Sequence, residues 1–196
     1  MMETILFYIK LGVFHVLDLG AYDHLLFLSA MALPFSFSKN KTLFYLVSVF
    51  TITHCTSLAL STYEVLEVNT SVIEFLIPLS ILLMVVFDVI YTQKLNSKSL
   101  RFHLIATAVF GLIHGFGFSN YFKMLMGQTQ DKITGLISFA IGLEIAQLII
   151  ILMVVVVVLL LTKTQLQKQQ IIKWGALLIG ALTLPLLYST FTSLLN

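Results

Sequence analysis

Two histidines and two aspartates fall within ten residues near the N-terminus, in the stretch HVLDLGAYDH. The sequence on either side, ILFYIKLGVF and LLFLSAMALPF, is almost purely apolar. Imidazole nitrogens and carboxylate oxygens are donors that bind divalent transition metals in proteins. The stretch therefore indicates a metal site with His15, Asp18, Asp23 and His24 as ligands. For Asp23 a second interpretation stays open, because an acidic residue stabilises the start of a helix as a cap or in its first turn.

Ionisable side chains also interrupt the apolar runs further along the chain. An Asp, Lys or Arg at the centre of a membrane helix costs about 2.5 to 3.5 kcal/mol to insert, so each such residue calls for a function or a partner. The interiors of these runs hold no Lys or Arg that could neutralise the acids. A cation is the simplest missing partner, and its candidate ligands within the runs are His54, Glu74, His114 and Glu144.

The spacing around these residues predicts that they face the protein interior. In FTITHCTSL, polar residues recur every three positions around His54 and form a stripe that would serve no purpose against lipid. In FGLIHGFGFS, glycines flank His114 and allow a neighbouring backbone to approach closely. Glu144 shares a helix face with Gln147. We therefore expect residues from distant parts of the chain to meet in one outward-facing cavity.

Structural interpretations compete with this one. A single intramembrane histidine is often only hydrogen-bonded between helices, and a buried glutamate can be protonated and neutral. Asp88 is expected at the cytoplasmic interface and His103 in a solvated flank, so both are left out of the site. Cys55 is the only cysteine, which excludes an internal disulfide and argues against a thiolate metal site. Nitrogen and oxygen ligands suit nickel, cobalt, zinc or iron, and affinity order alone does not choose among these metals.

The composition requires a membrane environment for the elements that carry these residues. Hydrophobic residues make up 59% of the chain, charged residues only 10%, and the mean hydropathy is +1.01. We predict an all-α, polytopic transmembrane bundle in a single domain, residues 1–196, because each apolar run approaches the roughly 20 residues that cross a bilayer as a helix. Residues 3 to 17 are too few for a confident span and are expected to form a short seventh span or an interfacial or re-entrant helix. The six confident spans are expected at residues 21 to 36, 42 to 62, 70 to 92, 101 to 120, 134 to 162 and 171 to 193.

The distribution of basic residues predicts the orientation. Cytoplasmic loops of membrane proteins are enriched in Lys and Arg. The candidate site and the C-terminus are then expected on the exterior side. The N-terminus lacks the features of a cleavable signal peptide, and no basic patch suggests a nucleic-acid partner. Three alternating connections, predicted to be cytoplasmic, contain Lys39, Lys41, Lys94, Lys98, Arg101, Lys163, Lys168 and Lys173.

Five segments together resemble a known family. GVFHVLDLGAYDHLLFL, FTITHCTSL, VIEFLIPLS, FGLIHGFGFS and FAIGLEIAQ, in this order over nearly the whole chain, are similar to the HupE/UreJ family of hydrogenase and urease accessory membrane proteins. The resemblance implies a multi-pass protein of the bacterial inner membrane that acts as a nickel permease and supplies metalloenzyme assembly. Matched segment by segment, it implies functional roles for His15, Asp23, His24, Glu74 and His114, and less directly for Glu144.

Three functions remain open from the sequence. The first is a permease that takes a divalent metal ion, nickel before zinc or cobalt, from the exterior through the lipid bilayer. The second is a membrane-embedded, zinc-dependent hydrolase facing the exterior, in which histidines and an aspartate hold the metal and a glutamate activates water. The third is a metal sensor or assembly factor without turnover. The permease is the preferred prediction, chiefly because of the family resemblance.

Overall fold

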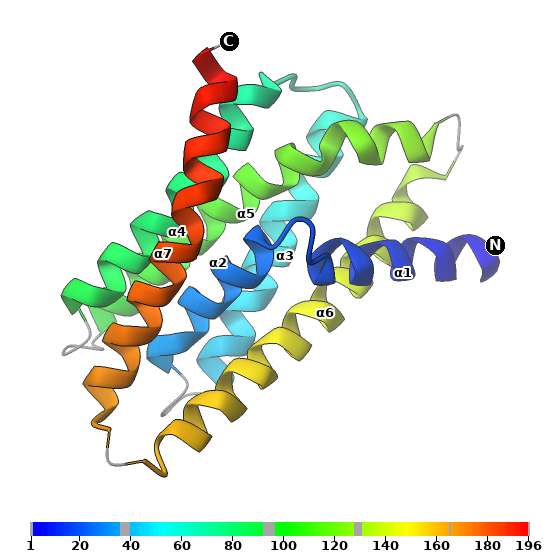
Figure 1. Ribbon diagram of the computed structural model, residues 1–196. Coiled ribbons are helices and arrows are strands. Elements are labelled where there is room, and N and C mark those ends of the chain that lie inside the picture. The colour runs from blue at the N-terminus through cyan, green and yellow to red at the C-terminus, as the bar shows by residue number, and fades with distance from the viewer. Residues whose placement is uncertain (1, 36–39, 92–96, 128–130, 165, 196) are drawn as a thin grey trace.

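The computed structural model describes residues 2–35, 40–91, 97–127, 131–164 and 166–195. Over these residues the chain is all-helical and contains no strand, as predicted. Figure 1 shows long helices packed in a bundle, with one shorter helix running across its side. The elements in order are α1 (Met2–Leu17), α2 (Asp23–Ala32), the 3-10 turn η1 (Leu33–Phe35), α3 (Asn40–Thr62), α4 (Thr70–Tyr91), α5 (Ser97–Met126), α6 (Lys132–Leu161) and α7 (Lys168–Leu195).

Five of these helices are long and apolar enough to cross a membrane, namely α3 to α7. They confirm five of the six predicted spans, although the predicted end at residue 92 lies outside the described residues. The end of α6 and the start of α7 lie at the same end of the bundle as the start of α3 (Figure 1). The end of α4 and the start of α5 also lie there, so the helix ends beside the three basic connections gather on one side.

The prediction of a sixth span at residues 21 to 36 is not confirmed for the part that the structure describes, residues 21 to 35. This segment forms a 10-residue helix, α2, and the 3-residue turn η1, which together are too short to cross a hydrocarbon core of roughly 30 Å. The preceding turn begins at Asp18, whose Oδ1 accepts a hydrogen bond of 2.8 Å from the amide of Gly20. Pro34, which has no amide to donate, lies in η1 just after α2. The first 16-residue helix, α1, is not among the candidate spans either.

Close backbone contact joins α3 to α5, as the glycines around His114 predict. A Cβ atom built at Gly111 would lie 2.8 Å from the carbonyl oxygen of Phe50, and one at Gly115 would collide with the carbonyl oxygen of His54. Only glycine fits at such distances, so α3 and α5 pack with little room between their backbones. This contact fixes the position of His54 relative to His114.

A second close crossing holds α1 against α6. A Cβ atom at Gly12 would lie 2.8 Å from the amide nitrogen of Leu143, and one at Gly142 would lie 2.9 Å from the carbonyl carbon of Ile9. The short helix is therefore seated on α6 by backbone contact. This crossing places the C-terminal end of α1 near the centre of the bundle (Figure 1).

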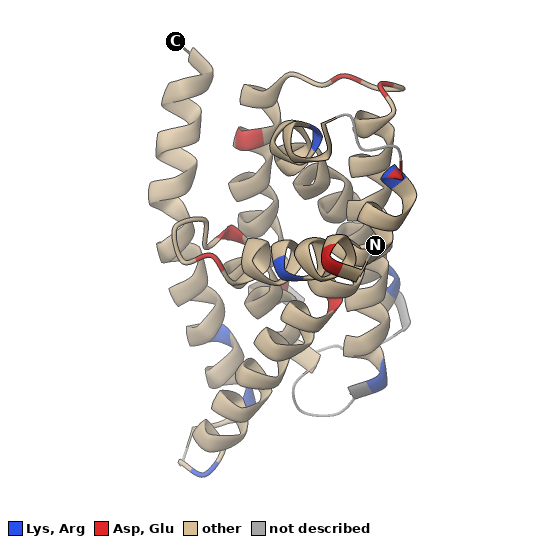
Figure 2. Ribbon diagram, turned by 90° about the vertical axis from the view of Figure 1, so that its right-hand side faces the viewer, with Lys and Arg blue, Asp and Glu red and all other residues tan. Residues whose placement is uncertain are grey.

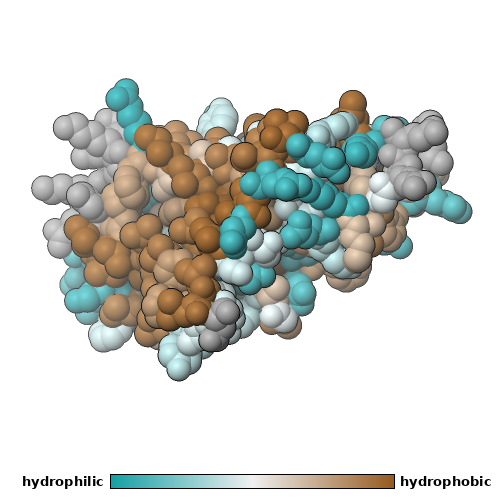
Figure 3. Space-filling view, turned by 90° about the horizontal axis from the view of Figure 1, so that it is seen from above, coloured by the Kyte–Doolittle hydropathy of each residue, from teal (hydrophilic) through white to brown (hydrophobic). Residues whose placement is uncertain are grey.

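The outer surface of the bundle is suited to lipid. Large apolar side chains such as Ile105, Leu152 and Leu178 are more than 60% exposed. Figure 2 shows long stretches of helix with few charged residues between them, and Figure 3 shows apolar side chains covering much of one face. An apolar exterior of this size is stable only in contact with lipid or detergent, which agrees with a multi-pass membrane protein.

Candidate metal centre

Four histidines meet where the chain turns from α1 into α2. His15 lies in the last turn of α1 and His24 in the first turn of α2, while α3 and α5 contribute His54 and His114. The ring centroid of His24 lies 4.6 Å from that of His15, 5.9 Å from that of His54 and 5.0 Å from that of His114. The rings of His15 and His54 are 5.7 Å apart. We call these four residues the histidine cluster.

Hydrogen bonds orient two of these rings. Nδ1 of His114 lies 2.8 Å from the carbonyl oxygen of Phe110. Because a carbonyl oxygen can only accept, Nδ1 carries the proton and Nε2 of the neutral ring keeps a free lone pair. Nδ1 of His24 lies 3.2 Å from Oδ1 of Asp23, which also accepts the backbone amide of His24 at 2.9 Å. A partner on the second ring nitrogen is a regular feature of histidines that bind metal.

Five of the six remaining ring nitrogens are buried and have no hydrogen-bond partner among the described residues. They are Nε2 of His15, His24 and His114, and both ring nitrogens of His54. A buried polar atom without a partner costs about 1 to 3 kcal/mol, and five such atoms on adjoining rings are too many for a merely structural cluster. An ion that accepts nitrogen lone pairs would satisfy them.

The cluster is not a completed coordination sphere. Among the described residues, no three His, Cys, Asp or Glu side chains are already placed to hold one metal ion. Binding therefore requires the rings to turn toward a common point. His15 lies outside the five candidate spans. Burial, and then the neighbouring His24 and His54, lower the pKa of its imidazole well below the ordinary value, which favours the neutral ring. A neutral imidazole is the form that binds a metal.

Aromatic side chains enclose the histidine cluster. The ring of Phe118 lies 3.8 Å from that of His15, and the ring of Phe139 stacks on His54 at 6.2 Å. The exposed fractions of His24, His54 and His114 are 3%, 0% and 1%. The structure therefore shows a closed, low-dielectric site in place of the open cavity that we expected.

Three of the predicted acidic ligands lie apart from the cluster contacts just described. Asp18 is exposed and accepts the amide of Gly20 in the turn before α2. Glu74 is exposed on α4 and forms no hydrogen bond or ion pair with the histidine cluster as far as the described residues go. Glu144 accepts a 2.7 Å hydrogen bond from the hydroxyl of Ser48, which joins α6 to α3. The structure brings together five of the eight predicted residues, which are His15, Asp23, His24, His54 and His114.

The structure shows where Asp23 lies relative to the start of α2, which bears on its two interpretations as a metal ligand and as a residue that stabilises the helix start. The N-cap position of α2 is Tyr22, so Asp23 is not the cap and lies in the first turn. Its carboxylate there interacts favourably with the helix dipole and also contacts His24. The two roles are compatible in one residue.

Two polar residues left out of the predicted site are buried inside the protein. Asp88 is 2% exposed and His103 is 1% exposed, and His103 Nε2 lies 3.4 Å from Asp88 Oδ1. His103 is therefore not solvated as we expected, whereas Asp88 lies near the end of α4 with its side chain buried. The sequence contained a usable signal, because His103 precedes His114 by 11 residues, or about three helical turns, and therefore shares its helix face.

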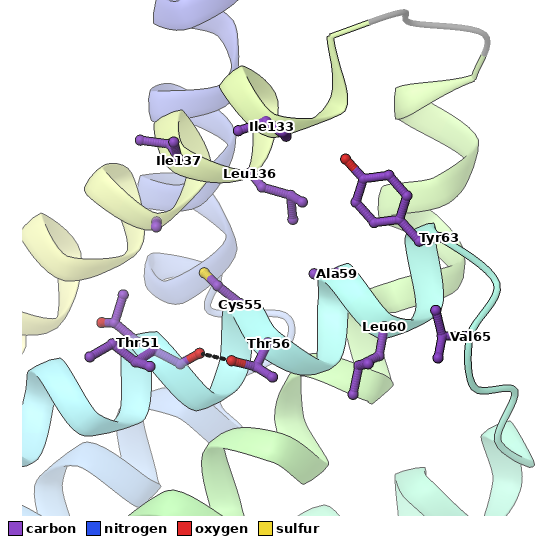
Figure 4. A pocket seen from close by; sticks show the side chains of 12 residues that line it. Thr51, Cys55, Thr56, Ala59, Leu60, Tyr63, Val65, Ile133, Leu136 and Ile137 are labelled. Carbon is purple, nitrogen blue, oxygen red and sulfur yellow. Dashed lines mark hydrogen bonds between the residues drawn. The ribbon is translucent and has the colours of Figure 1, made fainter.

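An apolar groove lies beside the cluster, between α3 and α6. Its volume is about 790 Å³, and Cys55, Tyr63 and Leu136 are among its lining residues (Figure 4). Apolar atoms form almost all of this lining, so the groove suits a lipid chain and not an ion. Cys55 therefore faces the groove, although its neighbour in the sequence, His54, belongs to the histidine cluster.

The fold and site define a class, a multi-pass helical membrane protein with a buried histidine cluster. A model of the HupE/UreJ protein family matches residues 1–189, and the chain belongs to this family. It is an accessory and transport family and not a known family of enzymes. No curated protein and no solved structure matches the chain.

Proposed function

We propose that this protein is a permease that carries a divalent transition-metal ion, nickel before zinc or cobalt, across the bacterial inner membrane. The observation that carries the proposal is the set of buried, unpartnered nitrogens on the four rings of the histidine cluster. Membership of the HupE/UreJ family supports it. The metal is the cargo of the protein and not a resident cofactor.

Each member of the site has a separate role in this proposal. His24 and His114 present Nε2 to the ion, because Asp23 and the carbonyl of Phe110 hold their other ring nitrogens. His54 and His15 complete a nitrogen-rich set from α3 and α1. Imidazole donors without a thiolate favour nickel, cobalt or zinc over softer ions such as Cu(I).

The interruption between α1 and α2 supports a transport function. Discontinuous helices that meet near the middle of the membrane commonly form the substrate sites of transporters. The N-terminus of α2 carries the positive end of a helix dipole, which is unfavourable beside a cation. The carboxylate of Asp23 in this first turn offsets the dipole and supplies negative charge next to the cluster.

The orientation that we propose places the basic connections in the cytoplasm and the C-terminus outside. The helix ends beside these connections lie at one end of the bundle, as a consistent topology requires (Figure 1). The ion then enters from the side of the bundle where α7 ends, reaches the histidine cluster and leaves toward the basic connections.

The hydrolase alternative has less support in the structure. A metal-dependent hydrolase needs a carboxylate beside the metal to activate water. Glu144 is engaged by Ser48 and Glu74 is exposed. Asp23 lies beside the histidine cluster, but its carboxylate is already engaged by Nδ1 of His24.

Uptake of radioactive nickel by cells tests the permease proposal. We expect His24→Ala and His114→Ala to lose nearly all accumulation above that of cells lacking the protein. Thr183→Val is the control, because Thr183 is buried in α7 and, among the described residues, its hydroxyl bonds only within its own helix, to Ile179. Wild-type accumulation by His24→Ala, with equal amounts of protein in the membrane, would rule out the proposal.

A further inference from the structure

A second buried polar pair joins α4 to α5 near the basic connections. Asp88 lies close to the end of α4 and His103 close to the start of α5. Both are at least 98% buried. The pair therefore lies inside the protein, between the histidine cluster and the end of the bundle where the basic connections start.

The distance within the pair is long for a hydrogen bond. His103 Nε2 and Asp88 Oδ1 are 3.4 Å apart, whereas an N–H···O bond usually measures about 2.7 to 3.2 Å. Two ligand atoms that each lie about 2.1 Å from a four-coordinate metal are about 3.4 Å apart. The separation thus matches two ligands of one cation better than it matches a direct bond.

Two polar atoms lack partners, one in the pair itself and one a helical turn after His103 on α5. Asp88 Oδ2 and Thr107 Oγ1 are buried without a hydrogen-bond partner among the described residues. The ring of Phe35 lies 4.8 Å from His103 and that of Phe87 lies 4.9 Å from it, so the surroundings are apolar. In the described part of the chain, Asp88 forms no ion pair with a Lys or Arg. A buried carboxylate in this setting is stabilised by a cation.

The pair and the histidine cluster share one face of α5. His103, Thr107 and His114 are spaced by four and seven residues, which returns each to the same side of an α-helix. The backbone rises by about 16 Å from His103 to His114. Phe110 lies between them, and its ring packs 5.3 Å from that of Phe27, which also contacts His114 at 5.5 Å. The two polar positions are thus separated by an aromatic layer.

We propose that Asp88 and His103 form a second, inner binding site for the divalent cation, which receives the ion from the histidine cluster before its release to the cytoplasm. This inference rests on the proposed function. Within the described residues no third His, Cys, Asp or Glu completes the site, so its other ligands would have to come from water or from Thr107, one turn along α5 from His103. Binding is therefore weaker than at the histidine cluster, and a weak last site allows an ion to leave.

Equilibrium dialysis of the purified, detergent-solubilised protein against radioactive nickel tests the inner site. We expect the wild type to bind two ions per chain, one more weakly than the other. Asp88→Asn should bind only the stronger ion, because asparagine keeps an oxygen for His103 but has no charge. Thr183→Val should bind two, and a thermal unfolding midpoint close to that of the wild type shows that each variant is folded.

The outcomes separate the two proposals. A wild type that binds one ion, or an Asp88→Asn protein that still binds two, overturns the inner site. Loss of the weaker ion in Asp88→Asn supports binding at Asp88 and His103. If His24→Ala nevertheless keeps the stronger ion, the histidine cluster is not the stronger site and the proposed function fails separately. If Asp88→Asn does not fold, His103→Gln provides the same test, since its side-chain amide can still donate to Asp88.

Discussion

The Nδ1 atom of His114 lies 2.8 Å from the carbonyl oxygen of Phe110, one turn earlier in α5. A hydroxyl at position 114 could use that carbonyl equally well, so the bond by itself does not require a histidine. The histidine is explained by its opposite nitrogen, Nε2, which is buried and has no partner among the described residues. The backbone of α5 therefore fixes the orientation in which the ring presents a lone pair.

Asp23→Asn should weaken nickel binding by about 10- to 100-fold, the usual effect of losing a residue that orients a metal-bound histidine. Asparagine can still accept a bond from His24 but supplies no negative charge. Competition dialysis against a chelator of known affinity measures the change. Asp18→Asn is the matched control, because Asp18 is exposed and contacts the amide of Gly20. A larger effect at Asp18 than at Asp23 would reverse the assignment of the two aspartates.

Nickel should raise the thermal unfolding midpoint of the purified protein, and a chelator should lower it again. A ligand that binds only the folded state at 100 times its Kd adds about 2.7 kcal/mol of stability. His54→Ala should lose most of this shift, since neither ring nitrogen of His54 has a hydrogen-bond partner in the described part of the chain. Thr183→Val should keep it. Equal shifts in both variants would show that nickel binds elsewhere.

Gly115→Ala should destabilise the protein by about 1 to 3 kcal/mol, the usual cost of overpacking. The added methyl group would meet the backbone of His54, which cannot move without separating α3 from α5. Gly180→Ala is the control, because its methyl group would meet side chains and no backbone, Val85 at 3.2 Å and Leu82 at 3.9 Å. Thermal unfolding in detergent compares the two. Similar midpoints would mean that the contact between α3 and α5 yields easily.

Glu144→Gln should leave nickel affinity unchanged and reduce stability, by about 1 kcal/mol for a weakened hydrogen bond. Its carboxylate accepts a bond from Ser48, so its contribution lies in joining α6 to α3. Combining it with Ser48→Ala should cost less than the sum of the single changes. A tenfold loss of nickel affinity would instead make Glu144 a ligand, as the sequence suggested.

The burial of His54 and His114 could be predicted from the sequence because the signals for it are local to one helix each. The polar stripe around His54 and the glycines beside His114 each identify the inward face of one helix, and both faces are buried as expected. Similarly, five apolar runs of sufficient length identify α3 to α7. Periodicity and hydropathy are properties of single helices, so they can be recognised without knowing the packing.

Other features depend on how helices pack and could not be obtained in this way. The run at residues 21 to 36 is apolar enough for a span, but its helix starts at the centre of the bundle and not at its edge (Figure 1). Glu74 is exposed because α4 packs mainly against α7 and α5 through its other faces. Asp88 is buried for the complementary reason, since its face of α4 meets His103.

The close contact of α1 with α6 at Gly12 also determines where one imidazole of the histidine cluster lies. His15 is three residues beyond this contact, a rise of about 4.5 Å along the helix. A substitution at Gly12 or Gly142 that parted the two backbones would therefore displace His15 directly. The other three histidines are carried by α2, α3 and α5, so such a change would shift one ring relative to the other three.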